Sequence, residues 1–440
     1  MTTGALLSWG RYPRFPQTAH ACHWRNDLGT SLVSTAAAFG TTLAYGNGRS
    51  YGDSCLAASD HVLYMGRMDR FISARWDKGI LSAEAGVTLG EILSLAIPRG
   101  WFLPVLPGTK YVTLGGAIAN DVHGKNHHLH GTFGRHLRCF GLVRSQDGYQ
   151  HCSPRDNPAL FAATIGGLGL TGVISWAELQ LRPIRSSDID TLTVRFSSLA
   201  EFFSLSREID PDYEFAVAWI DCAARRGETG RGVYSAGNFA QGGGGLSVTS
   251  PLRLSIPVQP PFSLVNAASV RLFNAAHWHR HSRRRRFRRV DYDAYLCPLD
   301  GIRNWNRLYG PAGFQQYQCL IPEPHAESAI RELLEAVADA GEGSFLAVLK
   351  RCGNQISPGL MSFPRPGVTL ALDFPQRGAL ERGLLKRLDA IVREAGGHLY
   401  PAKDAHMGGE DFRRSYPAWE QVEALRDPAL CSRFWQRVTG

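Results

Sequence analysis

The stretch that decides the fold runs from Pro104 to Asn126 and reads PVLPGTKYVTLGGAIANDVHGKN, with four glycines and two alanines. Such a stretch makes a poor surface helix, because each glycine costs about 1 kcal/mol relative to alanine. A backbone that lacks Cβ atoms can instead pass close to a ligand. The polar residues from Asn120 onward then follow on the same loop. The stretch therefore indicates a cofactor cradle next to a reactive site, with a purely structural glycine turn as the alternative.

A second glycine loop, YGNGRSYGD at Tyr45–Asp53, follows the apolar, strand-like run Thr41–Ala44. Its backbone N–H groups can form an anion-binding nest, to which Arg49 adds a fixed positive charge. The loop lacks the Gly-Lys-Ser/Thr ending of a Walker loop and the spacing of the dinucleotide-binding fingerprint. A third loop, GGLGLTGVI at Gly166–Ile174, again precedes a strand. Together the loops favour the cofactor interpretation over the structural turn.

In this order the three loops resemble the p-cresol methylhydroxylase/vanillyl-alcohol oxidase (PCMH/VAO) superfamily of FAD-binding proteins. The segments GRSYGD, PGTKYVTLGGAIANDVHGKNHH and LYPAKD narrow the resemblance to its decaprenylphosphoryl-β-D-ribose 2-oxidase family. The resemblance covers nearly the whole chain. It implies an α+β fold with an FAD-binding domain at 1–184 and a substrate domain at 185–397, built on an antiparallel sheet covered by helices. A C-terminal segment, 398–440, is expected to return to the FAD domain.

The hydrophobic pattern supports this division into two domains. Residues before about 184 predict short strands broken by glycine turns, with few helices; one helix begins at the capping box Thr88-Leu89-Gly90-Glu91. Residues 315–401 show a β-α-β-β-α-β order, which is typical of a ferredoxin-like domain. Between them, residues 230–245, with a run of four glycines, and the Pro- and Arg-rich residues 250–290 predict loops. No internal repeat is visible.

Composition limits the class of protein. The 440 residues, 44% of them hydrophobic, suffice for two domains with a sizeable core. No run approaches the roughly 20 apolar residues that span a bilayer, and the N-terminus lacks the pattern of a secretory signal. The nine scattered cysteines include no Cys-x-x-Cys pair and indicate reduced thiols. We therefore expect a cytoplasmic protein, or one bound peripherally at the inner membrane.

The net charge of +9 is concentrated in residues 277–289, HWHRHSRRRRFRR, which contain seven arginines. A solvated, partly disordered loop is the simplest interpretation of this run. Attraction to anionic lipid headgroups is the main alternative, at about 1 kcal/mol per basic residue near a membrane. Nucleic-acid binding is disfavoured, because no recognition motif accompanies the run.

The resemblance assigns most FAD contacts to the glycine loops. The predicted contacts are Tyr45, Gly46, Asn47, Gly48, Arg49, Ser50, Tyr51, Gly52, Asp53, Gly108, Thr109, Thr113, Gly115, Gly116, Asn120, Val122, His123, Gly124, Asn126, Ile174 and Tyr400. Many relatives bind the flavin covalently through a histidine at the position of Tyr51, so we expect noncovalent FAD. Adjacent histidines such as His127, His128 and His130 rarely converge on one ion, and no metal site is predicted.

Lys403 is the sharpest catalytic candidate, because a lysine directly after a buried strand is unlike an ordinary solvated lysine. By resemblance it lies beside flavin and substrate, where its charge stabilises reduced flavin or orients the hydroxyl. His123, Lys350 and Gln318 complete the predicted catalytic set. The predicted substrate residues are Gln316, Gln318, Lys350, Ala371 and Lys403. Mycobacterial members carry a cysteine where this chain has Ala371, which leaves pocket shape and substrate identity open.

The resemblance implies oxidation of the 2-hydroxyl of a polyprenyl-phosphate-linked pentose to a ketone by FAD. A separate NAD(P)H-dependent short-chain reductase would reduce that ketone and complete a ribose-to-arabinose epimerisation for cell-envelope glycan synthesis. A soluble aldonolactone or alditol oxidase is the alternative within the same class. A non-catalytic flavin- or carbohydrate-binding protein is the alternative from another class. The lipid carrier, the electron acceptor and the oligomeric state stay open at this point.

Overall fold

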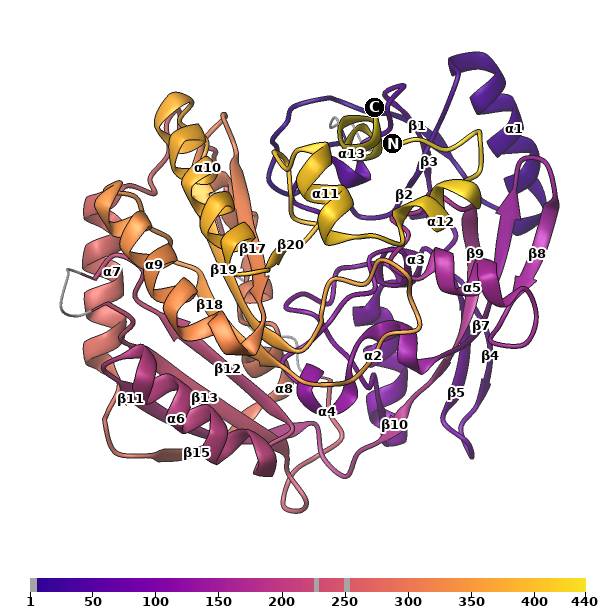
Figure 1. The fold of residues 1–440 in the computed structure, drawn as a ribbon. Coiled ribbons are helices and arrows are strands. Elements are labelled where there is room, and N and C mark those ends of the chain that lie inside the picture. The colour runs from indigo at the N-terminus through magenta and orange to yellow at the C-terminus, as the bar shows by residue number, and fades with distance from the viewer. Residues whose placement is uncertain (1–5, 225–228, 249–253) are drawn as a thin grey trace.

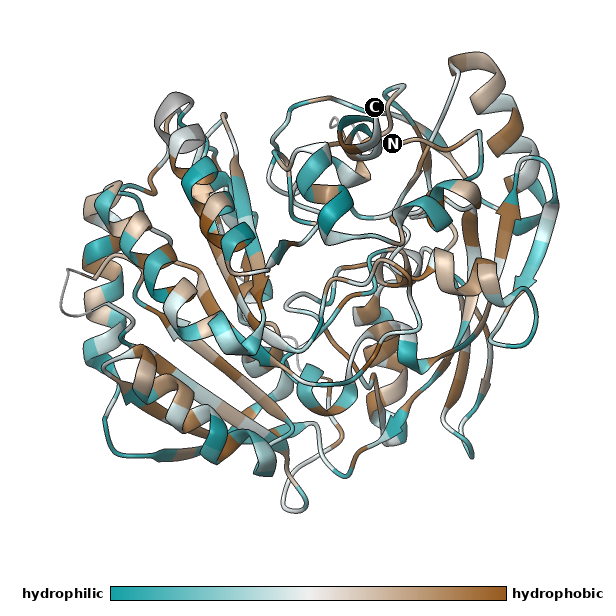
Figure 2. Cartoon of the chain, in the orientation of Figure 1, coloured by the Kyte–Doolittle hydropathy of each residue, from teal (hydrophilic) through white to brown (hydrophobic). Residues whose placement is uncertain are grey.

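Two β-sheets lie side by side in the computed structural model, which describes residues 6–224, 229–248 and 254–440 (Figure 1). A five-stranded sheet belongs to the N-terminal part of the chain, and an eight-stranded sheet belongs to the following part. Helices accompany both sheets, so the predicted α+β class is confirmed. Figure 2 shows hydrophobic residues concentrated in the sheet strands, whereas the helices beside the larger sheet carry many hydrophilic residues.

The N-terminal part contains the antiparallel five-stranded sheet, in the order β4-β5-β9-β7-β8. Its strands are β4 (Phe71–Arg75), β5 (Ile80–Glu84), β9 (Val173–Gln180), β7 (Leu137–Arg144) and β8 (Gly148–Cys152). Three short parallel strands, in the order β1-β3-β2, form a second small sheet: β1 (Thr18–Ala21), β3 (His61–Tyr64) and β2 (Ala44–Tyr45). A two-stranded pair joins β6 (Trp101–Phe102) to β10 (Arg182–Pro183). The helices are α1 (Leu28–Phe39), α2 (Leu89–Ala96), α3 (Leu114–Ala119), α4 (His127–His130) and α5 (Pro158–Thr164).

Local sequence explains two of these helices. Helix α2 starts at the predicted capping box, in which Thr88 Oγ1 accepts from Glu91 N at 3.2 Å and the Glu91 carboxylate accepts from Thr88 N at 2.8 Å. Helix α3 lies inside the glycine-rich stretch, despite its two glycines, because it is short, largely buried and capped by Thr113. At Gly115 a Cβ would lie 3.0 Å from the Cβ of Ala85, so a small residue lets α3 pack closely against the chain.

The larger sheet is antiparallel throughout, in the order β15-β11-β13-β12-β18-β19-β17-β20. Its strands are β11 (Asp188–Phe196), β12 (Phe215–Ile220), β13 (Gly232–Phe239), β15 (Arg286–Asp291), β17 (Phe314–Ile321), β18 (Ala347–Cys352), β19 (Gly367–Pro375) and β20 (His398–Leu399). The accompanying helices are α6 (Leu199–Ile209), α7 (Ala267–Arg280), α8 (Tyr292–Leu296), α9 (Ala326–Asp339) and α10 (Ala379–Glu394). The predicted β-α-β-β-α-β order corresponds to β17-α9-β18-β19-α10-β20. A parallel pair, β14 (Leu254–Ser255) and β16 (Ile302–Arg303), lies outside this sheet.

The larger sheet repeats its strand order, although no repeat is visible in the sequence. Each half places its fourth, first, third and second strands side by side, and the two second strands, β12 and β18, meet in the middle. Helices α6, α9 and α10 pack in one apolar core with the sheet. Helix α7 packs on the opposite face, where its His277 ring lies 4.6 Å from that of Trp219. The repeat therefore concerns strand order and not helix placement.

Two loop predictions are wrong. Within residues 250–290, expected to be loop, the structure has helix α7 and strand β15. Asn266 caps α7 and β15 pairs with β11, so local capping and a partner strand order the segment. Within residues 230–245 the structure has strand β13, and only the glycine run after it is irregular. Strand β13 is hydrogen-bonded to β11 along one edge and to β12 along the other. This pairing stabilises the strand although its glycines favour a loop.

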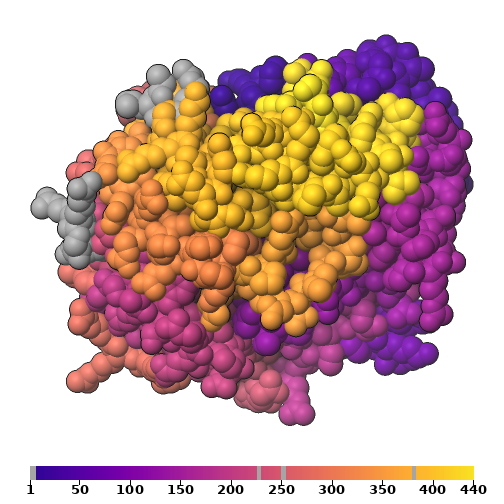
Figure 3. Space-filling model, in the orientation of Figure 1, coloured from indigo at the N-terminus to yellow at the C-terminus, as the bar shows by residue number. Residues whose placement is uncertain are grey.

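The C-terminal segment crosses from the larger sheet to the N-terminal part. Strand β20 belongs to the larger sheet, and helices α11 (Gly409–Ser415), α12 (Trp419–Ala424) and α13 (Arg433–Thr439) follow it. Arg437 in α13 pairs with Asp53 at 2.8 Å, and Arg433 pairs with Asp60 at 2.9 Å. Figure 3 shows this segment in yellow, spanning the surface between the two parts. Within the described ranges, none of the helices has the length and hydrophobicity to cross a membrane.

Candidate active site

A cavity of about 860 Å³ lies between the glycine loops and the larger sheet. One wall is formed by the loops at 46–51, 107–125 and 168–174. The opposite wall is formed by side chains from β12, β13, β17, β18 and β19. Segments far apart in the sequence thus meet at one concave surface, as expected for a cofactor and substrate site.

The cavity brings together most of the residues predicted for the site. The predicted residues that line it are Gly46, Asn47, Gly48, Arg49, Ser50, Tyr51, Gly108, Thr109, Thr113, Gly115, Gly116, Asn120, Val122, His123, Gly124, Ile174, Gln316, Gln318, Lys350, Ala371, Tyr400 and Lys403. The structure places four other predicted contacts away from this lining: Tyr45, Gly52, Asp53 and Asn126.

These four residues support the wall from behind. The Tyr45 hydroxyl donates to the Leu7 carbonyl at 2.6 Å, and the Asn126 amide donates to the Pro104 carbonyl at 2.8 Å. Asp53 pairs with the guanidinium of α13, and Gly52 leaves room for a backbone carbonyl that a Cβ would meet at 1.6 Å. Their contacts hold the loops in place.

The cavity wall formed by the glycine loops suits a flavin dinucleotide. A Cβ added at Gly108 or Gly169 would find no protein atom within 4 Å, so both backbones border open space within the lining. Arg49 lines the same wall and stacks on Trp9 at 4.3 Å and Tyr111 at 5.4 Å. Its buried Nε has no hydrogen-bond partner among the described residues. A glycine cradle with a fixed cation suits the diphosphate of FAD.

Lys403 lies at the polar end of the cavity, with Nζ 3.7 Å from the centre of the Tyr51 ring. Burial lowers the pKa of Lys403 to about 7, partly offset by the Asp373 carboxylate. Asp373 is fully buried and accepts from the Gln316 amide at 2.6 Å. Burial raises the pKa of Asp373 to about 7, against the Gln316 hydrogen bond and the Lys403 charge. This lysine can therefore change protonation state near neutral pH.

His123, Lys350 and Gln318 form a second polar group on the same lining. Lys350 Nζ lies 2.6 Å from His123 Nδ1 and donates to the Gly124 carbonyl at 2.8 Å. Burial, and then the Lys350 charge, hold the pKa of His123 well below its usual value, so the ring is neutral at pH 7. Burial also lowers the pKa of Lys350. The Gln318 amide lies 3.5 Å from His123 Nε2.

Comparison with known proteins agrees with this geometry. Residues 30–153 match the family model for an FAD binding domain. The chain is 33% identical to the decaprenylphosphoryl-β-D-ribose oxidase of Mycolicibacterium smegmatis, over 97% of this chain and 95% of the relative. This chain belongs to the decaprenylphosphoryl-β-D-ribose oxidase family. An uncharacterized Streptomyces coelicolor protein in the mprA 5′ region is 35% identical over 77% of this chain and 95% of its own length. Human delta(24)-sterol reductase is 32% identical, but over only 24% of this chain and 21% of its own.

The family and the FAD cofactor predicted from the sequence are thus confirmed, as is membership of the PCMH/VAO superfamily. The protein is an FAD-dependent oxidoreductase. Bound FAD supplies the two-electron oxidation, while the polypeptide supplies position, charge and proton transfer.

Sequence reasoning missed Asp373 and Trp219. Asp373 lies directly across from Gln316 in the β17–β19 register, so it stands behind the predicted substrate residues. A lone carboxylate within an apolar strand was the available signal. Trp219 extends the lining toward α7, together with His277. Because α7 was predicted as loop, its approach to the cavity was not foreseen.

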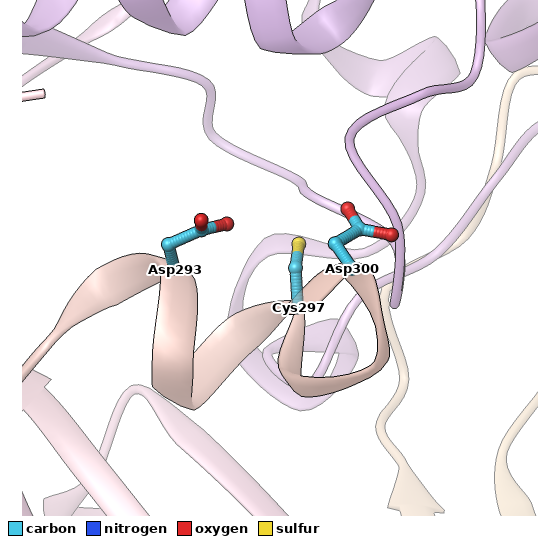
Figure 4. Close-up of side chains that lie close together, drawn as sticks. All are labelled: Asp293, Cys297 and Asp300. Carbon is cyan, nitrogen blue, oxygen red and sulfur yellow. The ribbon is translucent and has the colours of Figure 1, made fainter. Parts of the chain in front are cut away.

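Asp293, Cys297 and Asp300 bring three potential metal ligands within 4.8 Å of one another near the cavity (Figure 4). Lys110 already supplies a cation, because its Nζ lies 2.6 Å from Asp293. Its backbone N–H donates to Asp300 at 2.9 Å. Burial holds the pKa of the Cys297 thiol well above its usual value, which disfavours the thiolate that a metal needs. This cluster therefore anchors the loop at 108–110.

His127, His128 and His130 have different surroundings. His128 bonds to the Tyr213 carbonyl at 2.9 Å, and His130 lies 3.6 Å from Glu214. His127 is fully buried within α4, and burial lowers its pKa to about 3. Neither of its ring nitrogens has a hydrogen-bond partner among the described residues. His128 and His130 thus bond to different groups, and His127 bonds to neither of them.

Proposed function

We propose that the enzyme oxidises the 2-hydroxyl of a polyprenyl-phosphate-linked pentose to a ketone. The relative that matches from end to end carries decaprenylphosphoryl-ribose in its name. The observation that carries the proposal is Lys403, whose low-pKa amine stands on the lining beside Tyr51. A site that oxidises an alcohol needs such a proton acceptor near the cofactor.

Within this proposal the neutral amine of Lys403 accepts the proton of the substrate hydroxyl. The Asp373 carboxylate, which is hydrogen-bonded to Gln316, stabilises the positive charge that Lys403 then carries. Lys350 Nζ and His123 Nδ1 share a hydrogen bond, so this pair presents fixed polar groups for the sugar and the cofactor edge. Apolar side chains of the larger sheet exclude water from the remainder of the lining.

The proposal includes two partners. The keto product needs reduction by a separate NAD(P)H-dependent short-chain reductase to complete a ribose-to-arabinose epimerisation. The lipid-linked substrate also calls for work at the inner membrane surface, so we place the enzyme there as a peripheral protein. We keep the domain division proposed from the sequence, with FAD-binding residues in 1–184, substrate residues in 185–397 and a returning segment at 398–440.

Anaerobic mixing of the FAD-loaded protein with candidate sugars tests the proposed substrate. Detergent-solubilised polyprenyl-phosphoryl ribose should bleach the flavin absorbance in a single turnover, whereas aldonolactones and alditols at equal concentration should not. Bleaching by the soluble sugars alone would establish an aldonolactone or alditol oxidase instead. A yellow protein that none of these sugars bleaches would refute the oxidation proposed here.

A further inference from the structure

Exposed apolar side chains gather at the mouth of the cavity. Fifteen large apolar side chains are exposed among the described residues, and six of them lie between Leu254 and Phe273. These six are concentrated within a small part of the chain, whereas scattered single residues are the norm on soluble surfaces. A concentration of this kind marks an interaction surface.

One side of the mouth is formed by residues 254–262. Ile256 N donates to the Arg303 carbonyl at 3.0 Å, which ties this segment to strand β16, and Arg303 lines the cavity. Leu254 and Val258 on the segment are 70% and 73% exposed. Apolar groups thus stand in solvent beside the rim.

The other side of the mouth is formed by helix α7. Its inner face carries His277, which packs against Trp219, and both residues line the cavity. Its outer face carries Leu272, which is 75% exposed. Phe273 lies on the same face as His277, with the two rings 5.9 Å apart, and is 46% exposed. A helix with apolar residues on its inner and outer faces is expected to be covered on both.

Arginines continue this rim beyond α7. Arg286 lies across from Thr193 in the β15–β11 register, and Thr193 lines the cavity. Arg288 is two residues further along β15, so it projects from the same face of the sheet. Arg284 precedes them, and all three are exposed. None of the three forms an ion pair with any acidic residue in the described part of the chain.

We propose that this surface docks on an anionic lipid bilayer. We call it the mouth surface and define it as Leu254, Val258, Phe262, Leu272, Phe273, Arg284, Arg286 and Arg288. Arginines attract anionic headgroups, and exposed apolar side chains enter the headgroup boundary. A nucleic acid or an acidic protein would match the charge but leave the apolar side chains unexplained.

The proposal rests on the proposed function in one respect, namely a substrate with a prenyl tail. Docking at the mouth surface would place the cavity opening on the bilayer. The tail could then stay among the lipids while the sugar phosphate enters between α7 and β16.

Co-sedimentation of the FAD-loaded protein with phosphatidylcholine vesicles, with and without phosphatidylglycerol, tests the docking surface. The parent should bind the anionic vesicles at low salt. Arg284→Ser with Arg288→Ser should weaken binding by roughly 25-fold, at about fivefold per arginine. Leu272→Asp should weaken binding at high salt as well as at low salt, since it removes an inserting group, and more strongly at low salt, where the added carboxylate is repelled by the headgroups.

Matched controls use the far end of the molecule. Val33→Asp changes a residue that is 48% exposed on α1, at the opposite end from α7 (Figure 1). Arg67→Ser with Arg155→Ser removes equal charge from two exposed positions of the N-terminal part. Both controls should bind vesicles like the parent.

Three results would overturn the docking surface. These are a parent that does not bind anionic vesicles, mouth-surface variants that bind as tightly as the parent, and controls that lose as much binding. Vesicle binding needs no chemistry, so flavin bleaching in detergent separates the two proposals. Mouth-surface variants that lose vesicle binding yet bleach at the parent rate would support both the docking surface and the proposed substrate. If vesicle binding depends on the mouth surface but the parent is not bleached by polyprenyl-phosphoryl ribose, only the proposed substrate is refuted.

Discussion

Replacing Lys403 with alanine should abolish proton acceptance while leaving the fold and the cofactor in place. Among the described residues, Lys403 Nζ donates no hydrogen bond to the glycine loops. Its contact with them is the face of the Tyr51 ring. Cofactor binding therefore depends on other residues. Lys403→Ala should keep its FAD and its fold.

The magnitude follows from the surroundings of the amine. A positioned general base contributes about 10²–10⁴ in rate. Lys403 supplies the amine at this end of the cavity, where the Asp373 carboxylate acts on it electrostatically, so truncation removes the proton acceptor at that position. We expect flavin reduction to slow by on the order of 10² or more. Lys403→Arg should recover little, because a guanidinium does not release its proton near neutral pH.

The pH profile adds a second readout. The pKa of Lys403 is about 7, so the neutral amine is scarce below pH 7 and dominant above it. The parent rate of flavin reduction should therefore rise through pH 7 and level off. Lys403→Ala should lose this rise. The exposed Lys78→Ala serves as the control and should keep both the rate and the profile.

Single-turnover bleaching under anaerobic conditions, with FAD content measured in parallel, decides the matter. Lys403→Ala that is fully loaded and bleaches at the parent rate would refute the role of this amine. A variant that loses FAD would make Lys403 a cofactor-binding residue and move the search to His123, Lys350 and Tyr400.

Other perturbations test the cofactor, the C-terminal segment and the linkage to pH. Gly108→Ala should lower FAD affinity, because the added Cβ projects into the cavity. The fold should survive, since this Cβ would meet no protein atom. Gly242→Ala is equally uncrowded but remote, and fluorescence titration should show normal FAD binding. Arg437→Met should lower the free energy of unfolding by about 3–5 kcal/mol in urea, since it leaves the buried Asp53 carboxylate without its ion-pair partner and Asp404 with His406 alone; unchanged stability would contradict this. Lys403→Met should stabilise the FAD-free protein most below pH 7, where folding buries the charged lysine. This gain should vanish toward pH 10.5, because the amine is then neutral in both states; a gain independent of pH would contradict the shifted pKa. Acid precipitation should release all flavin colour, whereas colour in the pellet would show a covalent bond.

Short-range sequence signals determined much of the molecule. The Thr88–Glu91 capping box set the start of α2, and apolar periodicity set α9, α10 and the strands of the second half of the larger sheet. The glycine loops and the polar run after Asn120 pointed to the cofactor wall. These features depend on neighbouring residues along the chain, so they can be recognised without the fold.

Only the tertiary structure decided where distant segments meet. Strand β13 and strand β15 form because partner strands bond to their edges, although their composition suggested loops. Asp373 joins the site through its register with Gln316, and α7 reaches the cavity on the face of the sheet opposite α6. Hydrogen bonding across strands and burial of side chains depend on the whole fold. A local pattern therefore identifies the residues able to do chemistry, while packing decides which of them share one cavity.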